Sequence, residues 1–138
     1  MKASRRQLLQ ALSLTLAAQA IPQQSLGQTK KKLGLIFPVI DRGVPEEGLT
    51  LYGDQIDYVI ENLDLKTMTP EGYDAVIADI PEKAEKLAAQ NVDAIMVMGT
   101  SLTFYQGREF NERLAETVAN ATGLPTSTMS NGIINGLK

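Results

Sequence analysis

Short apolar runs, separated by helical patterns, constrain the fold of this 138-residue chain more than any other feature. Residues 33–37 (LGLIF) are continuously apolar and stop at Pro38, as a strand buried on both faces of a parallel sheet does. Residues 93–98 (DAIMVM) and 124–129 (LPTSTM) predict two more strands, and residues 56–61 alternate as a less central strand does. We therefore predict an α/β fold, in which a parallel sheet of about four strands is flanked by helices.

Two helical patterns lie between these strands. The first begins at Thr69, which can cap a helix, and carries apolar residues on one face. Pro81 interrupts this pattern, so we expect a bend there. The second pattern spans about residues 106–122 and ends at Gly123, a residue that favours the left-handed conformation after a helix.

Two segments carry weaker signals. Residues 39–54 connect two strands without apolar periodicity, and we predict a long loop, which in compact domains is usually functional or mobile. Ser130 is expected to cap a short helix over residues 131–138, although a helix of two turns is marginal by itself.

The amino-terminal residues resemble an export signal. Residues 1–6 are basic, residues 8–18 (LLQALSLTLAA) are largely apolar, and the AQA sequence that closes this stretch suits signal peptidase. The sequence SRRQLL at residues 4–9 resembles the twin-arginine signal of bacterial export. The alternatives are a mitochondrial-type leader and an accidental amphipathic segment.

We therefore predict two parts of the chain. Residues 1–28 form an export signal and linker, and residues 29–138 form an α/β lobe. Eleven largely apolar residues are too few for a bilayer that requires about 20, so we expect no permanent membrane span. The expected location is the periplasm.

Composition excludes several kinds of chemistry. The chain has no cysteine and no histidine, which removes thiolate nucleophiles, imidazole bases and Cys/His zinc sites. Residues 33–138 carry all sixteen acidic residues but only seven basic ones. Nucleic acid is therefore not an expected partner, because phosphate neutralisation requires clustered Lys and Arg.

In parallel α/β sheets, ligands bind beyond the carboxyl ends of the strands. The residues at these positions are Pro38, the Gly99-Thr100-Ser101 sequence and residues 127–130. Gly99 allows close backbone approach, and the hydroxyls of Thr100 and Ser101 could hold a carboxylate or a developing oxyanion. The same residues also suit turn and cap chemistry alone.

Three blocks of sequence together resemble the arylmalonate decarboxylase family, within the superfamily of Asp/Glu racemases and maleate isomerases. They are TPEGYDAVI at residues 69–77, MGTSLTFY at residues 98–105 with Phe110 and Asn111, and ATGLP at residues 121–125 with TMS at 128–130 and NGL at 135–137. The strand that ends in Pro38 also matches. The resemblance covers about residues 33–138 and is specific as a combination.

The resemblance implies that residues 29–138 are the N-terminal lobe of an Asp/Glu racemase-like fold, in which two α/β lobes face each other across a cleft, with no metal and no organic cofactor. It implies that Thr100 and Ser101 are catalytic and donate hydrogen bonds to the carboxylate of a small dicarboxylic acid, which becomes an enediolate. It also implies that Pro38, Tyr73 and Gly99 bind the substrate. One carboxylate would leave as carbon dioxide, and the carbanion would then be protonated.

Two departures from the family pattern matter. Racemases of the superfamily carry a cysteine where this chain has Gly99, so a racemase or maleate isomerase activity is the less favoured alternative. The protonating cysteine of the decarboxylases belongs to a second lobe, so we expect little turnover by this chain alone. A non-catalytic periplasmic carboxylate-binding module and a non-functional remnant remain alternatives. An exposed cleft face would favour self-association.

Overall fold

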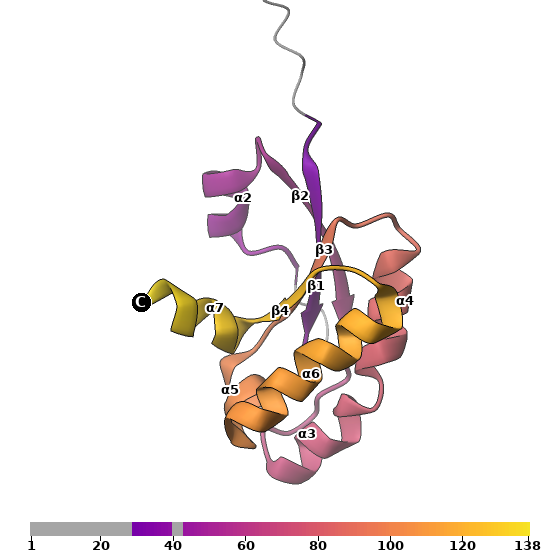
Figure 1. Ribbon diagram of the computed structural model, residues 1–138, viewed down its shortest axis with the longest axis vertical. Coiled ribbons are helices and arrows are strands. Elements are labelled where there is room, and N and C mark those ends of the chain that lie inside the picture. The colour runs from indigo at the N-terminus through magenta and orange to yellow at the C-terminus, as the bar shows by residue number, and fades with distance from the viewer. Residues whose placement is uncertain (1–28, 40–42) are drawn as a thin grey trace, which may run out of the picture.

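The computed structural model describes residues 29–39 and 43–138, and its centre is a sheet flanked by helices (Figure 1). The described residues form a four-stranded sheet in the order β2-β1-β3-β4, and every neighbouring pair is parallel. The strands are β1 (Lys31–Phe37), β2 (Ile56–Asn62), β3 (Ala94–Val97) and β4 (Thr126–Thr128). The α/β fold predicted from the sequence is therefore confirmed.

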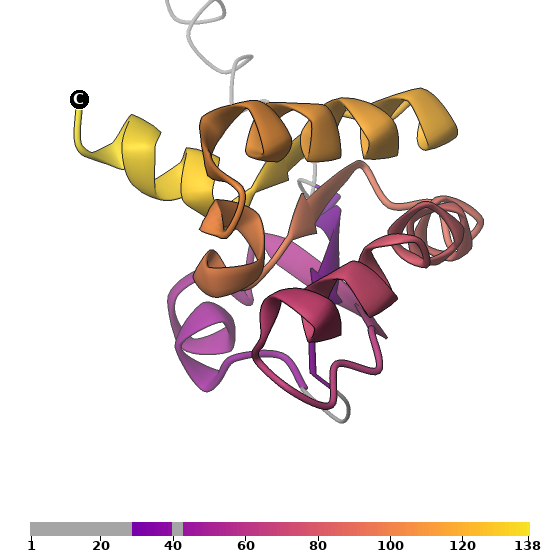
Figure 2. The same ribbon diagram turned by 90° about the horizontal axis from the view of Figure 1, so that it is seen from below.

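Helices flank this sheet on both sides. The described helices are α2 (Glu46–Tyr52), α3 (Pro70–Ile77), α4 (Ile80–Ala88), α5 (Thr100–Phe104), α6 (Gly107–Thr122) and α7 (Met129–Gly136). Helices α4 and α6 pack against each other, and they contact β1 and β4 respectively. Helices α2 and α7 lie on the opposite side of the strands from α4 (Figure 2).

The hydrophobic core fills the space between the sheet and the helices α4 and α6. On α6, Phe110, Leu114 and Val118 are buried, as their spacing predicts. On α4, Leu87 has no exposed surface and lies against Gly34 of β1, where an added Cβ would be 3.0 Å from Leu87 Cδ1. Glycine in β1 therefore allows α4 to approach the sheet closely.

The helix boundaries follow the signals in the sequence. Thr69 caps α3, because its hydroxyl oxygen accepts a hydrogen bond from Gly72 N at 3.2 Å. The expected bend at Pro81 is a break between α3 and α4, and Pro81 lies in the first turn of α4, where a proline costs little. Gly123 ends α6 with φ of 70°, the left-handed conformation expected there.

The prediction of a loop throughout residues 39–54 is wrong, because this segment contains α2. Pro45 precedes the helix, and two acidic residues occupy its first turn, as is typical of a helix start. None of the α2 residues is buried, so no apolar face marked the helix in the sequence. A hydrogen bond from Tyr58 Oη to Gly48 O at 3.4 Å connects α2 to β2.

The predicted cap of the last helix is also wrong. Thr128, and not Ser130, caps α7, and its hydroxyl oxygen accepts a hydrogen bond from Asn131 N at 3.1 Å. Ser130 lies inside the first turn and is completely buried.

The export signal predicted for residues 1–28 lies outside the described residues. Across residues 29–39 and 43–138, the structure contains no helix long and apolar enough to cross a membrane.

Candidate functional site

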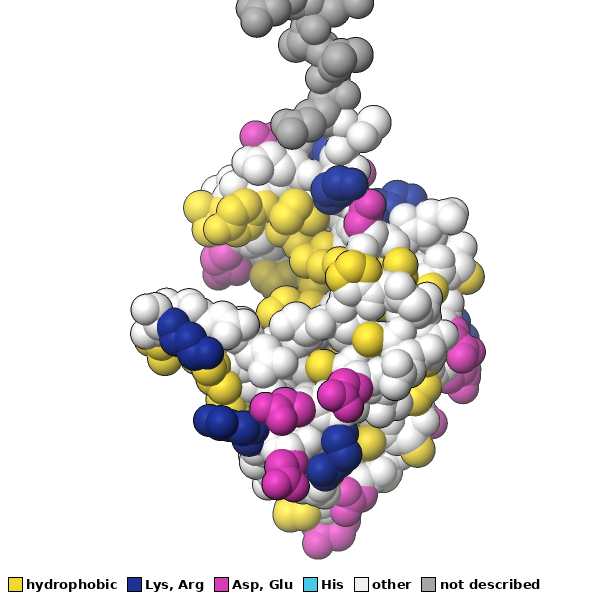
Figure 3. All heavy atoms as spheres, viewed as in Figure 1, with side chains coloured by type: hydrophobic (Ala, Val, Ile, Leu, Met, Phe, Trp, Pro, Cys, Tyr) yellow, Lys and Arg dark blue, Asp and Glu magenta, His cyan; other side chains and the backbone are white. Residues whose placement is uncertain are grey.

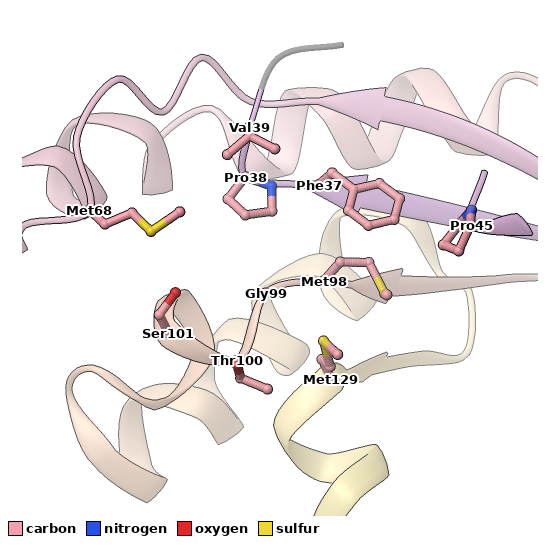
Figure 4. Close-up of a pocket in the computed structure, with 10 residues that line it drawn as sticks. All are labelled: Phe37, Pro38, Val39, Pro45, Met68, Met98, Gly99, Thr100, Ser101 and Met129. Carbon is pink, nitrogen blue, oxygen red and sulfur yellow. The ribbon is translucent and has the colours of Figure 1, made fainter. Parts of the chain in front are cut away.

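A cavity of about 320 Å³ lies beyond the carboxyl ends of β1 and β3 (Figure 4). Ten described residues line it: residues 37–39 after β1, residues 98–101 after β3, and Pro45, Met68 and Met129. In Figure 4, the residues after β1 and Met68 lie opposite Thr100, Ser101 and Met129. Topology therefore brings together segments that are 60 residues apart in the sequence, as expected for a parallel sheet.

Gly99 shapes the turn between β3 and α5. Its φ is 91°, a conformation that side chains rarely adopt, and an added Cβ would lie 2.8 Å from Pro38 Cγ. Glycine therefore allows the chain to turn directly against Pro38 and to place Thr100 and Ser101 at the cavity wall.

We predict that Gly99→Ala destabilises the chain by about 1–3 kcal/mol, because it adds backbone strain to the contact with Pro38. The matched control is Gly107→Ala, since Gly107 also has a positive φ (80°) but an added Cβ there meets nothing within 4 Å. Urea unfolding of both variants tests the prediction. Equal losses of stability would show that the contact with Pro38 contributes nothing.

The hydroxyls of Thr100 and Ser101 are available to a ligand. Thr100 is half-buried and Ser101 is exposed, and within the described part of the chain neither hydroxyl has a hydrogen-bond partner. In Figure 4 the Ser101 oxygen points toward the opposite wall of the cavity, where Met68 and Pro38 lie. Two adjacent hydroxyl donors in this arrangement can hold a carboxylate.

The end of β4 contributes less than the sequence predicted. Of residues 127–130, only Met129 lines the cavity. Thr128 and Ser130 are completely buried, and both are hydrogen-bonded to other side chains. Neither residue therefore faces the cavity.

Tyr73 does not lie at the cavity. It is 5% exposed, belongs to the hydrophobic core and packs against Tyr105, with ring centroids 5.0 Å apart. Four of the five predicted site residues (Pro38, Gly99, Thr100 and Ser101) thus line one cavity, and Tyr73 lies outside its lining. The role of each in substrate binding stays a prediction.

Tyr105 is unsuited to acid or base chemistry. Its hydroxyl donates a hydrogen bond to the Asp74 carboxylate and accepts one from Gln106 Nε2 at 2.6 Å. Burial, and then the neighbouring Asp74, raise the pKa of Tyr105 to about 12. The phenol therefore stays protonated and bound to Asp74 at neutral pH.

The described cavity wall is apolar and carries no charge. Phenylalanine, proline, valine and methionine side chains form most of it, and no Asp, Glu, Lys or Arg is among the described lining residues. Such a wall solvates a carboxylate poorly, whereas it accepts an apolar group or carbon dioxide. In residues 29–39 and 43–138, His, Cys, Asp and Glu form no cluster that could hold a metal ion.

Sequence reasoning missed two of the three methionines of this site, Met68 and Met98, whereas Met129 lies within the predicted range of residues 127–130. Met68, Met98 and Met129 all line the cavity, although they lie before α3, after β3 and after β4. A methionine as the last residue of a predicted strand is a usable signal for Met98, and the same signal marks Met129. No comparable signal marks Met68, which precedes a helix.

The fold is shared with solved structures of known proteins. A maleate isomerase, Iso from Pseudomonas putida S16, shares the fold with a TM-score of 0.70 at 18% identity, over 78% of this chain and 48% of that one. The chain therefore shares the fold of this maleate isomerase.

The chain belongs to the arylmalonate decarboxylase family, whose family model matches residues 33–138. Arylmalonate decarboxylase of Bordetella bronchiseptica is 42% identical over 106 residues, which are 77% of this chain and 44% of that protein. The crystal structure of a double mutant of arylmalonate decarboxylase in the liganded form has a TM-score of 0.74 at 41% identity, over 78% and 46% of the chains. This chain therefore spans less than half the length of these relatives.

Proposed function

We propose that this chain is the carboxylate-binding lobe of a cofactor-independent decarboxylase for malonate-type dicarboxylic acids. The observation that carries the proposal is the pair of unpartnered hydroxyls, Thr100 and Ser101, on the wall of an uncharged apolar cavity. Membership of the arylmalonate decarboxylase family supports it.

The geometry suits an enediolate intermediate. When the bond to one carboxylate breaks, its electron pair passes to the α-carbon and into the carboxylate that remains, while carbon dioxide departs. Thr100 and Ser101 would donate hydrogen bonds to that remaining carboxylate, whose charge increases during the step. The apolar wall around Pro38 and Met68 would hold the departing carboxylate, which loses its charge as it leaves.

The final protonation requires an acid that the described cavity does not supply. The chain has no cysteine and no histidine, and the pKa of Tyr105 is raised to about 12. We therefore propose that this chain binds the substrate and that its turnover, without further residues, is close to the background rate. Calorimetry with phenylmalonate and assay of carbon dioxide release test the two parts separately, and turnover near that of arylmalonate decarboxylase would contradict the second.

The alternative functions predict different results in the same experiments. A racemase would exchange the α-proton of a chiral acid in deuterated water, which requires a base that the described lining lacks. A maleate isomerase would instead convert maleate to fumarate. A non-catalytic carboxylate-binding module would bind malonates and simple monocarboxylates equally well. The proposed decarboxylase lobe instead binds phenylmalonate more weakly than phenylacetate, because the second carboxylate of phenylmalonate loses its hydration against the apolar wall.

We also propose that residues 1–28 direct export to the periplasm by the twin-arginine route. Replacing Arg5 and Arg6 together by lysine preserves the charge but removes the arginine pair. Export in a bacterial host should then stop, which periplasmic fractionation measures, whereas Lys2→Arg should leave it unchanged. Undiminished export of the double variant would contradict the proposal.

We further propose that copies of the chain associate through the apolar surface beside the site. Figure 3 shows hydrophobic side chains over α2 and in a hollow between α2 and α7. The exposed ones include Leu51 (64%) and Leu137 (83%). Leu51→Glu with Leu137→Glu should shift the chain to monomers in analytical ultracentrifugation, whereas Asn120→Glu, an exposed position on α6, should not. A wild-type chain that is monomeric at high concentration would exclude this association.

A further inference from the structure

Two buried hydroxyls connect α5 to α7 directly behind the candidate site. Thr103 lies on α5, Ser130 lies in the first turn of α7, and neither has any exposed surface. Their hydroxyl oxygens are in hydrogen-bond contact with each other. Thr103 Oγ1 also lies 3.1 Å from Gly99 O and 3.4 Å from Thr100 O.

The direction of these hydrogen bonds follows from the number of protons. A hydroxyl has one proton, and the proton of Thr103 is donated to the carbonyl oxygen of Gly99. We assign Ser130 as the donor to Thr103 Oγ1, because among the described residues its hydroxyl has no other hydrogen-bond partner. The result is a chain of hydrogen bonds from Ser130 through Thr103 to Gly99, the residue directly before Thr100.

Helix α7, which carries Ser130, is itself fixed by α6. Asn111 of α6 accepts a hydrogen bond from Thr128 Oγ1 at 2.6 Å, and its Nδ2 donates to Asn131 Oδ1 at 2.6 Å. Thr128 and Asn131 are the cap and a first-turn residue of α7. The position of Ser130 relative to the core is therefore set by two further hydrogen bonds, one buried and one partly buried.

We propose that the Thr103–Ser130 pair positions the turn at Gly99, and with it the hydroxyls of Thr100 and Ser101. This inference rests on the proposed function, because it assigns the pair to the carboxylate site. Thr103 and Ser130 touch no substrate and act through the turn. A buried pair of hydroxyls suits this task, because a shift of α5 away from α7 would leave the hydroxyl of Ser130 without a partner.

The test compares variants that separate positioning from stability. In Thr103→Val, the hydroxyl of Ser130 loses its partner, so the fold should be weakened as well. In Thr103→Val with Ser130→Ala, both polar groups are gone, and stability should be close to wild type. Both variants should bind phenylmalonate about tenfold more weakly, as expected for residues in one hydrogen-bond network. Thr103→Ser keeps the hydroxyl and should restore the affinity.

The matched control is Thr122→Val, because Thr122 Oγ1 also donates to the carbonyl four residues earlier, at 2.8 Å, but at the far end of α6. This variant should bind phenylmalonate as the wild type does. A double variant at Thr103 and Ser130 that is stable and binds with wild-type affinity would overturn the proposal.

A measurement without ligand separates this inference from the proposed function. The amide of Thr103 donates to Gly99 O at 3.1 Å, so its hydrogen exchange reports the order of the turn. We expect exchange about tenfold faster in the double variant at Thr103 and Ser130 than in the wild type. If the wild type does not bind phenylmalonate, the proposed function fails, but hydrogen exchange still tests the role of the Thr103–Ser130 pair. An exchange rate at position 103 that is the same in the double variant as in the wild type would show that the pair does not position the turn at Gly99.

Discussion

Replacing both hydroxyls, in the variant Thr100→Ala with Ser101→Ala, is expected to eliminate measurable binding of phenylmalonate. Each hydrogen bond to a charged group contributes about 1.5–3 kcal/mol, so each substitution should raise Kd by about 10- to 100-fold. Neither side chain has a hydrogen-bond partner in the described residues, and neither belongs to the buried core. The double variant should therefore keep the stability of the wild type, and isothermal calorimetry measures the loss.

The control for this prediction is Thr117→Ala. Thr117 is exposed on α6, outside the cavity lining, and donates to Arg113 O at 2.8 Å. Its substitution should leave Kd unchanged. Retention of wild-type affinity by the double variant at Thr100 and Ser101 would remove the basis of the proposed function.

The largest expected loss of stability follows Leu87→Ala. Leu87 has no exposed surface and packs against β1 at Gly34, so its truncation leaves a cavity between α4 and the sheet. Such substitutions cost about 2–5 kcal/mol, a large part of the about 5–15 kcal/mol that stabilises a typical domain. Urea unfolding should show this loss, whereas Leu51→Ala, at a position that is 64% exposed, should change stability by less than about 0.5 kcal/mol.

A double-mutant cycle with Gly34→Ala tests the packing further. In the wild type, the new methyl group would lie 3.0 Å from Leu87 Cδ1, so Gly34→Ala should destabilise the chain. In the Leu87→Ala background the contacts with the two Cδ atoms disappear and only the contact with Cβ, at 3.3 Å, remains, so the same methyl group should cost less. Additive effects would show that α4 does not depend on this close approach.

The main elements could be predicted because their signals are local. Residues 33–37 are apolar and end at a proline, and the apolar spacing on α6 together with Gly123 defines that helix. Helix α2 could not be found by the same reasoning, since none of its residues is buried. Hydrophobic periodicity reveals a helix only when one face packs on a core.

The site residues whose positions follow from the order of the strands could be predicted from the sequence. Those whose positions depend on contacts between residues far apart in the sequence could not. A parallel sheet places Pro38 and Gly99 at the same edge, so their proximity follows from the strand assignment. The contact between Thr103 and Ser130 joins residues 27 positions apart, and nothing local distinguishes Ser130 from a helix cap. For Tyr73, the resemblance implies a place in the pocket. Its side chain instead belongs to the hydrophobic core and lies outside the described cavity lining.

The measurement that tests the carboxylate site most directly is a titration of phenylmalonate observed through ¹³C-labelled methionine methyl groups. Met68, Met98 and Met129 line the cavity, whereas Met96 lies in β3 outside that lining and serves as an internal reference. The account predicts saturable shifts of the three cavity methyl signals, a constant Met96 signal, and no shifts in the variant that lacks both hydroxyls, Thr100→Ala with Ser101→Ala. Cavity signals that stay constant in the wild type, or that shift equally in that variant, would contradict it.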